Sequence, residues 1–134
     1  MHMIKLMVVD DEKDSLLLYQ LMFRSEIKNG EVELHCFDGA QKALDAMSSN
    51  LTDISVILSD INMPNMDGFE FLKHVRESNS SIPVFMVSAY GDEAHTNEAK
   101  KLGASDYFTK PVNFAMLKER INEVTSNRST VKTA

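Results

Sequence analysis

The run Ile4-Lys5-Leu6-Met7-Val8-Val9, near the start of the chain, is apolar and is followed at once by the acids Asp10 and Asp11. A second run of this kind, 54–59, ends in Asp60. Short runs rich in Val and Ile that alternate with helical patterns are typical of buried strands in a parallel sheet. Because ligands of such sheets bind beyond the carboxyl ends of the strands, we expect the three acids to meet at one rim.

Three carboxylates at one rim call for a cation. Like charges at this distance repel one another, and some of the acids would stay protonated unless a positive charge neutralised them. Ligand sets made only of oxygen atoms favour magnesium among the divalent metals. The sequence therefore predicts a Mg²⁺ site at this rim.

Strand and helix patterns alternate five times along the chain. The predicted strands are 4–9, 32–37, 54–59, 83–88 and 105–109, and the predicted helices are 13–27, 40–48, 67–78, 92–102 and 113–125. Right-handed crossovers would place these helices on both faces of a parallel sheet. We expect one α/β domain over 1–125, followed by a polar tail or the start of a linker over 126–134.

Composition limits the classes of function. The 134 residues are 43% hydrophobic and 25% charged, which is ordinary for a globular domain. No apolar stretch approaches the ~20 residues of a membrane span and no signal peptide is visible, so we expect a cytoplasmic location without a membrane partner. The net charge of -6 disfavours direct binding of nucleic acid by this domain. The four histidines lack metal-ligand spacing and are expected in surface or packing roles.

Two further polar groups belong to the same rim. Ser88 follows the fourth predicted strand, and Lys110 follows the fifth. A phosphoryl group on Asp60 could meet the metal on one side, and the hydroxyl and the ammonium on the others. Phosphoryl transfer needs this arrangement, since its catalysis is mostly positioning and charge neutralisation.

With these features the chain resembles the receiver domains of two-component response regulators, over about residues 4–125. The resemblance is carried by the runs Val8-Val9-Asp10-Asp11-Glu12, Ser59-Asp60-Ile61-Asn62-Met63-Pro64-Asn65-Met66-Asp67-Gly68, Val87-Ser88-Ala89, Leu102-Gly103-Ala104-Ser105-Asp106-Tyr107 and Lys110-Pro111. It implies a flavodoxin-like, doubly wound (βα)5 fold whose five-stranded parallel sheet has the order 2-1-3-4-5.

The resemblance also implies roles for the acids. Asp60 would accept a phosphoryl group from a histidine kinase or a histidine phosphotransfer protein. Asp10, Asp11 and Asp60 would hold Mg²⁺ together with the backbone carbonyl of Asn62. The peptide bond Lys110-Pro111 would be cis.

The other site residues follow in the same way. Ser88 and Lys110 would contact the phosphoryl oxygens, and Tyr107 would be the rotating aromatic that, with Ser88, reports the phosphorylation state. Asn62 and Tyr90 would tune self-dephosphorylation, because each lies two residues beyond a rim residue and borders the path of an attacking water.

Output is less closely defined by the sequence. By resemblance, phosphorylation would switch the face formed by the fourth helix, the fifth strand and the fifth helix, and so control an output domain or a downstream partner. Asp106 and Arg120 fit the paired charges of members that dimerise there to bind DNA, but Ser105 and Met116 stand where acids are common. This pattern disfavours a DNA-binding output of that subclass.

The predicted first helix contains the run 16–23, which is apolar nearly all round. One explanation is that the fifth helix covers it; the other is that it forms a docking surface for a helical phosphotransfer partner.

Two other functions fit the sequence less well. A Mg²⁺-dependent aspartyl-phosphate phosphatase of the haloacid-dehalogenase type would place Asp-x-Asp after the first strand, where this chain has adjacent aspartates, and Asn62 is not an acid. A non-phosphorylated binding module would have lost acids or the lysine, and all are present. We therefore expect a signalling phosphoacceptor that catalyses only its own phosphorylation and dephosphorylation, rather than an enzyme.

Overall fold

A single parallel sheet organises the molecule. The computed structural model describes residues 3–78 and 81–133, and over these residues the sheet has the predicted order β2-β1-β3-β4-β5. Its strands are β1 (Ile4–Val9), β2 (Val32–Phe37), β3 (Val56–Asp60), β4 (Val84–Ser88) and β5 (Asp106–Thr109). All neighbouring strands pair in parallel. The predicted fold class is therefore confirmed.

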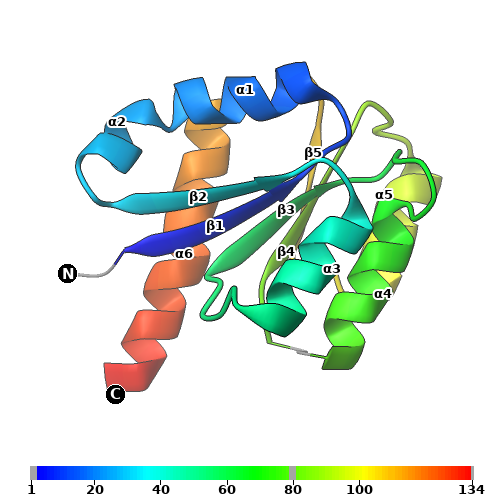
Figure 1. The fold of residues 1–134 in the computed structure, drawn as a ribbon. Coiled ribbons are helices and arrows are strands. Elements are labelled where there is room, and N and C mark those ends of the chain that lie inside the picture. Colours follow the sequence, from blue (N-terminus) through cyan, green and yellow to red (C-terminus); the bar gives the residue numbers. More distant parts are fainter. Residues whose placement is uncertain (1–2, 79–80, 134) are drawn as a thin grey trace.

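Helices cover both faces of the sheet (Figure 1). They are α1 (Lys13–Met22), α2 (Arg24–Lys28), α3 (Ala40–Ser49), α4 (Gly68–Ser78), α5 (Glu93–Lys101) and α6 (Phe114–Thr133). One core cluster joins α1 and α6 to one face, and the other joins α3, α4 and α5 to the opposite face. Successive strand residues alternate between the clusters, because side chains along a strand point to opposite faces.

The apolar stripes of the sequence form these cores. Ala43 of α3 and Leu117 of α6 are fully buried. On the α1 and α6 face, the rings of Tyr19 and Phe114 meet edge to face, with centroids 5.5 Å apart. Pairs of this geometry stabilise a core beyond the area that they bury.

Two helix boundaries differ from the prediction. The predicted helix 13–27 is interrupted at Phe23, whose backbone leaves the helical region (φ -102°, ψ 9°) while its ring is buried. The last helix does not end near 125 but continues through Thr133. The apolar stripe ends at Val124, but the residues up to Thr133 include no glycine or proline that would end the helix. The division between a domain and a tail stays a prediction.

The helices beside the rim are held unequally. Helix α4 buries Gly68, Phe71, Leu72 and Val75, whereas α5 buries only Ala99 among its residues. On α1, Tyr19 is buried, but Leu17 and Leu21 stay more than half exposed, so α6 covers only part of the apolar run. Across 3–78 and 81–133, none of the helices combines the length and the apolar character that crossing a membrane requires.

Candidate functional site

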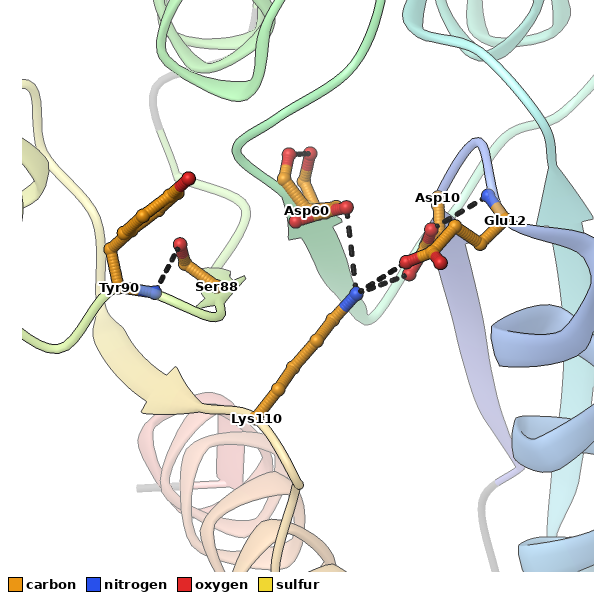
Figure 2. A network of polar contacts seen from close by, with 7 residues as sticks. Asp10, Glu12, Asp60, Ser88, Tyr90 and Lys110 are labelled. Carbon is orange, nitrogen blue, oxygen red and sulfur yellow. Dashed lines mark hydrogen bonds and ion pairs between the residues drawn. The ribbon is translucent and has the colours of Figure 1, made fainter.

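The carboxyl ends of β1 and β3 bring two buried acids together. Asp10 directly follows β1 and Asp60 is the last residue of β3, and these strands are neighbours in the sheet. Their side chains lie at one rim with that of Glu12 (Figure 2). One carboxylate oxygen of each of these three residues lies within 4.8 Å of those of the other two. Asp10 and Asp60 are only 2% and 6% exposed.

The acids that converge differ from the predicted set. Asp11 is exposed and does not belong to this group, whereas Glu12, which the sequence did not indicate, does. The backbone N–H of Glu12 donates to Asp10 Oδ1 at 2.9 Å, which folds the chain back over the rim. The spacing of Asp10 and Glu12 could have indicated this contact, because Asp and Asn side chains often accept from the backbone N–H two residues further along the chain.

Lys110 is the cation of this rim. Its Nζ lies 3.1 Å from Asp10 Oδ2, 3.5 Å from Glu12 Oε1 and 3.5 Å from Asp60 Oδ2. Burial alone would lower the pKa of the Lys110 ammonium, but the carboxylates of Asp10 and Asp60 outweigh burial and raise that pKa. The lysine therefore stays charged, and one ammonium serves three acids.

Asp60 is the acid with the most perturbed titration at the rim. Burial and the negative charge of Asp10 raise the pKa of Asp60 to about 6, although Lys110 acts in the opposite direction. Protein groups alone therefore neutralise only part of the negative charge of ionised Asp60. Oxygen donors that converge and lack counter-charge are what a hard divalent cation binds, so the residues present fit the metal site that the sequence predicts.

Ser88 reaches the same rim from the end of β4 and is fully buried. Its Oγ accepts a hydrogen bond from the backbone N–H of Tyr90 at 3.0 Å. A hydroxyl that accepts in this way keeps its own proton for another acceptor. The backbone N–H of Lys110 donates to the Ser88 carbonyl at 2.8 Å, which holds the ends of β4 and β5 together.

Two aromatic residues adjoin Ser88. Tyr107 of β5 donates its hydroxyl to the backbone carbonyl of Tyr90, and partial burial raises the pKa of Tyr107. The Tyr90 side chain is half exposed. In Figure 2, Ser88 and Tyr90 stand on one side of Asp60, opposite Asp10 and Glu12.

The loop after Asp60 leads into α4 through a turn. Its turn includes Asn65, which has a positive φ of 72°, and Asn62 is exposed in it. Asp67 Oδ1 accepts from the N–H of Glu70 at 2.9 Å, which caps the start of α4. A Cβ on Gly68 would lie 2.2 Å from the Asp60 carbonyl oxygen, so only glycine lets α4 begin this close to the end of β3.

The predicted switch face corresponds to α5, β5 and α6. Asp106 Oδ2 accepts from Arg120 Nε at 2.6 Å, so these two charges are paired within the chain. Ser105 Oγ accepts from the N–H of Val84, and Met116 is 57% exposed. The bond before Pro111 is cis, as the resemblance implies.

Comparisons with known proteins give one consistent result. The sequence model of the family described as "Response regulator receiver domain" matches residues 6–122. The chain is 30% identical over 119 residues to "Sporulation initiation phosphotransferase F" of Bacillus subtilis (strain 168), covering 89% of this chain and 91% of that protein. It is also 30% identical over 133 residues to "Two-component response regulator ARR10" of Arabidopsis thaliana, covering 95% of this chain.

The extent of these matches differs. The chain spans 23% of the length of the Arabidopsis regulator, so what the rest of that protein does is not carried by the match. Among solved structures, the receiver domain of the Francisella response regulator 1452 is 30% identical with a TM-score of 0.79, covering 92% of this chain and 98% of that one. A receiver domain protein from Clostridium thermocellum, 23% identical with a TM-score of 0.85, covers 96% of this chain and 99% of its own and supports the fold alone.

Proposed function

Because this chain belongs to the family of response regulator receiver domains, we propose that it is the phosphoacceptor of a two-component phosphorelay, with Asp60 as the residue that is phosphorylated. The observation that carries the proposal is the convergence on buried Asp60 of Asp10, Glu12 and the ammonium of Lys110. Family membership favours this signalling role over the phosphatase alternative.

The donor is a phosphohistidine of a kinase or of a histidine phosphotransfer protein. A carboxylate oxygen of Asp60 attacks the phosphorus, the P–N bond of the donor breaks, and the imidazole nitrogen keeps the electron pair. When the signal ends, water attacks the phosphorus and the P–O bond to Asp60 breaks. This hydrolysis releases phosphate and restores the carboxylate. Both steps need charge neutralisation more than they need a proton donor.

Residues of this chain would supply part of that neutralisation. Lys110 lies 3.5 Å from Asp60 Oδ2 and would contact a phosphoryl oxygen. Ser88, whose Oγ already accepts from the Tyr90 N–H, would donate its proton to another. A Mg²⁺ ion bound by Asp60, Asp10 and either Glu12 or Asp11, with the Asn62 carbonyl as a further ligand, would offset the negative charge of the transferring group.

Phosphorylation then changes the surface. A phosphoryl group adds roughly −1.5 to −2 charges and strong acceptors that draw on Ser88. Tyr107 is linked to the same loop through the Tyr90 carbonyl, so the change would reach α5, β5 and α6. The output domain or partner that reads this face, and a cytoplasmic location, stay predictions.

Intact mass after treatment with acetyl phosphate and Mg²⁺ tests the assignment. The wild type should gain one phosphoryl group that hydroxylamine removes, as expected for an acyl phosphate, and Asp60→Asn should gain none. The matched control is Asp53→Asn at the opposite end of the same sheet, where the positive φ of 59° suits asparagine equally well. An adduct that persists in Asp60→Asn, or forms equally well in EDTA, refutes the proposal.

A further inference from the structure

His95 of α5 is the centre of an aromatic stack beside the rim. Its ring stacks on that of Tyr90, with centroids 5.1 Å apart and an angle of 15° between the planes. The ring of Phe69 in α4 also stacks on His95, at 6.4 Å and 27°. Rings at these separations attract one another beyond the effect of burial. The stack therefore joins the start of α4, the loop after β4 and the start of α5.

The orientation of the His95 ring is fixed by Asp92. Asp92 is the N-cap of α5 and accepts from the backbone N–H of His95 at 3.3 Å. Its Oδ1 also lies 2.6 Å from His95 Nδ1. Because a carboxylate only accepts, Nδ1 carries a proton in this contact. A side chain held by a hydrogen bond at one edge and by a ring on its face has lost most of its rotamer freedom.

Tyr90 is thereby held at three points. Its N–H donates to Ser88 Oγ, its carbonyl accepts from the Tyr107 hydroxyl, and its ring rests on His95. The first two contacts fix the backbone, and only the third fixes the ring. The ring is half exposed, so loss of the His95 contact would leave the ring freer to turn toward solvent.

We propose that His95 is a positioning residue that holds the Tyr90 ring beside the phosphoryl site and thereby lengthens the life of the aspartyl phosphate. This inference rests on the proposed function, since it concerns the group on Asp60. His95 need not touch that group. It acts through Tyr90, which stands with Ser88 on one side of Asp60 (Figure 2) and, held there, leaves less space for a water that attacks the phosphorus in line.

The test compares rates of phosphate release at fixed pH and Mg²⁺ after excess acetyl phosphate is removed. His95→Ala should release phosphate about two- to tenfold faster than the wild type, the range that one aromatic contact spans. His95→Phe, which keeps a ring, should stay within about twofold of the wild type by the same measure. His74→Ala on α4 is the matched control, because this histidine is exposed and pairs only with Glu77 among the contacts of its ring.

The double variant decides whether His95 acts through Tyr90. Tyr90→Ala and the pair Tyr90→Ala with His95→Ala should release phosphate at the same rate, because the ring that His95 holds is already gone. An equal acceleration by His95→Ala in both backgrounds overturns the inference, and so does a rate in His95→Phe that equals that of His95→Ala.

Nuclear magnetic resonance supplies a readout that does not need phosphorylation. The chain has three tyrosines, so the Tyr90 ring resonances can be assigned, and they should show contacts to the His95 ring in the wild type. Absence of these contacts overturns the inference whatever the rates are. A wild type that takes up no phosphoryl group refutes the proposed function as well, whereas a normal adduct with an unchanged rate in His95→Ala refutes the inference alone.

Discussion

Replacing Asp60 by asparagine should stabilise the metal-free protein. Asp60 is 6% exposed and lies near Asp10, so its carboxylate is held in an unfavourable environment. Asparagine has nearly the same shape and carries no charge. The variant therefore removes the cost of ionising a buried acid, and it also removes the proposed phosphorylation site. Stability and activity should move in opposite directions at this one position.

The size of the effect follows from the pKa of Asp60, which is raised from 3.8 to about 6. A difference of about two pKa units corresponds to about 3 kcal/mol at pH 7, because one unit is about 1.4 kcal/mol. Between these two values the folded protein binds more protons than the unfolded chain, so the stability of the wild type falls as pH rises from about 4 to about 6. Above about pH 6 the stability of the wild type no longer falls through this group. The asparagine variant does not lose stability in this way.

Urea unfolding in EDTA at pH 4 and pH 7 measures both quantities. The advantage of Asp60→Asn should be small at pH 4 and reach about 2 to 3 kcal/mol at pH 7. Added Mg²⁺ should stabilise the wild type more than the variant, since it binds the ionised site of the folded state. Asp53→Asn should show neither effect. If Asp60→Asn is no more stable than the wild type at pH 7, or is more stable by the same amount at both pH values, then ionised Asp60 does not destabilise the folded protein.

Three other outcomes are expected. Gly68→Ala should lower the free energy of unfolding by about 1 to 3 kcal/mol in chemical denaturation, because its Cβ would meet the Asp60 carbonyl; an unchanged midpoint would mean that α4 can shift at no cost. Backbone hydrogen exchange in α5 should change when beryllofluoride is bound with Mg²⁺, since only Ala99 of its residues is buried; changes confined to α4 would contradict this switch. Tyr90→Ala should release phosphate faster than the wild type and than Asn62→Ala under identical Mg²⁺, and a slower rate would show that the ring does not hinder water.

The backbone of the site could be predicted from the sequence. Apolar runs mark the strands, and parallel strands deliver their carboxyl ends to one rim, so Asp10, Asp60 and Lys110 were expected together and lie together. This inference needs only the order of residues along each strand and the direction of the strands. It does not depend on how any side chain turns.

The features that the sequence did not predict depend on side-chain rotamers or on packing. Glu12 reaches the rim because its N–H folds back onto Asp10, while its neighbour Asp11 is exposed and outside this group. The stack around His95 combines three elements that are distant in the sequence. The interruption at Phe23, where no glycine or proline stands, coincides with burial of its ring.

The start of α4 also makes the rim stiffer on one side than on the other. At Gly68 the helix backbone lies against the backbone of Asp60 with no side chain between them, and three further buried residues hold the helix to the sheet. Helix α4 therefore has little room to move toward β3 at this point. On the other side, α5 is anchored through Ala99 and the half-exposed ring of Tyr90. If Asp60 is phosphorylated as proposed, we therefore expect α5 to move more readily than α4, because fewer buried residues hold α5 to the sheet.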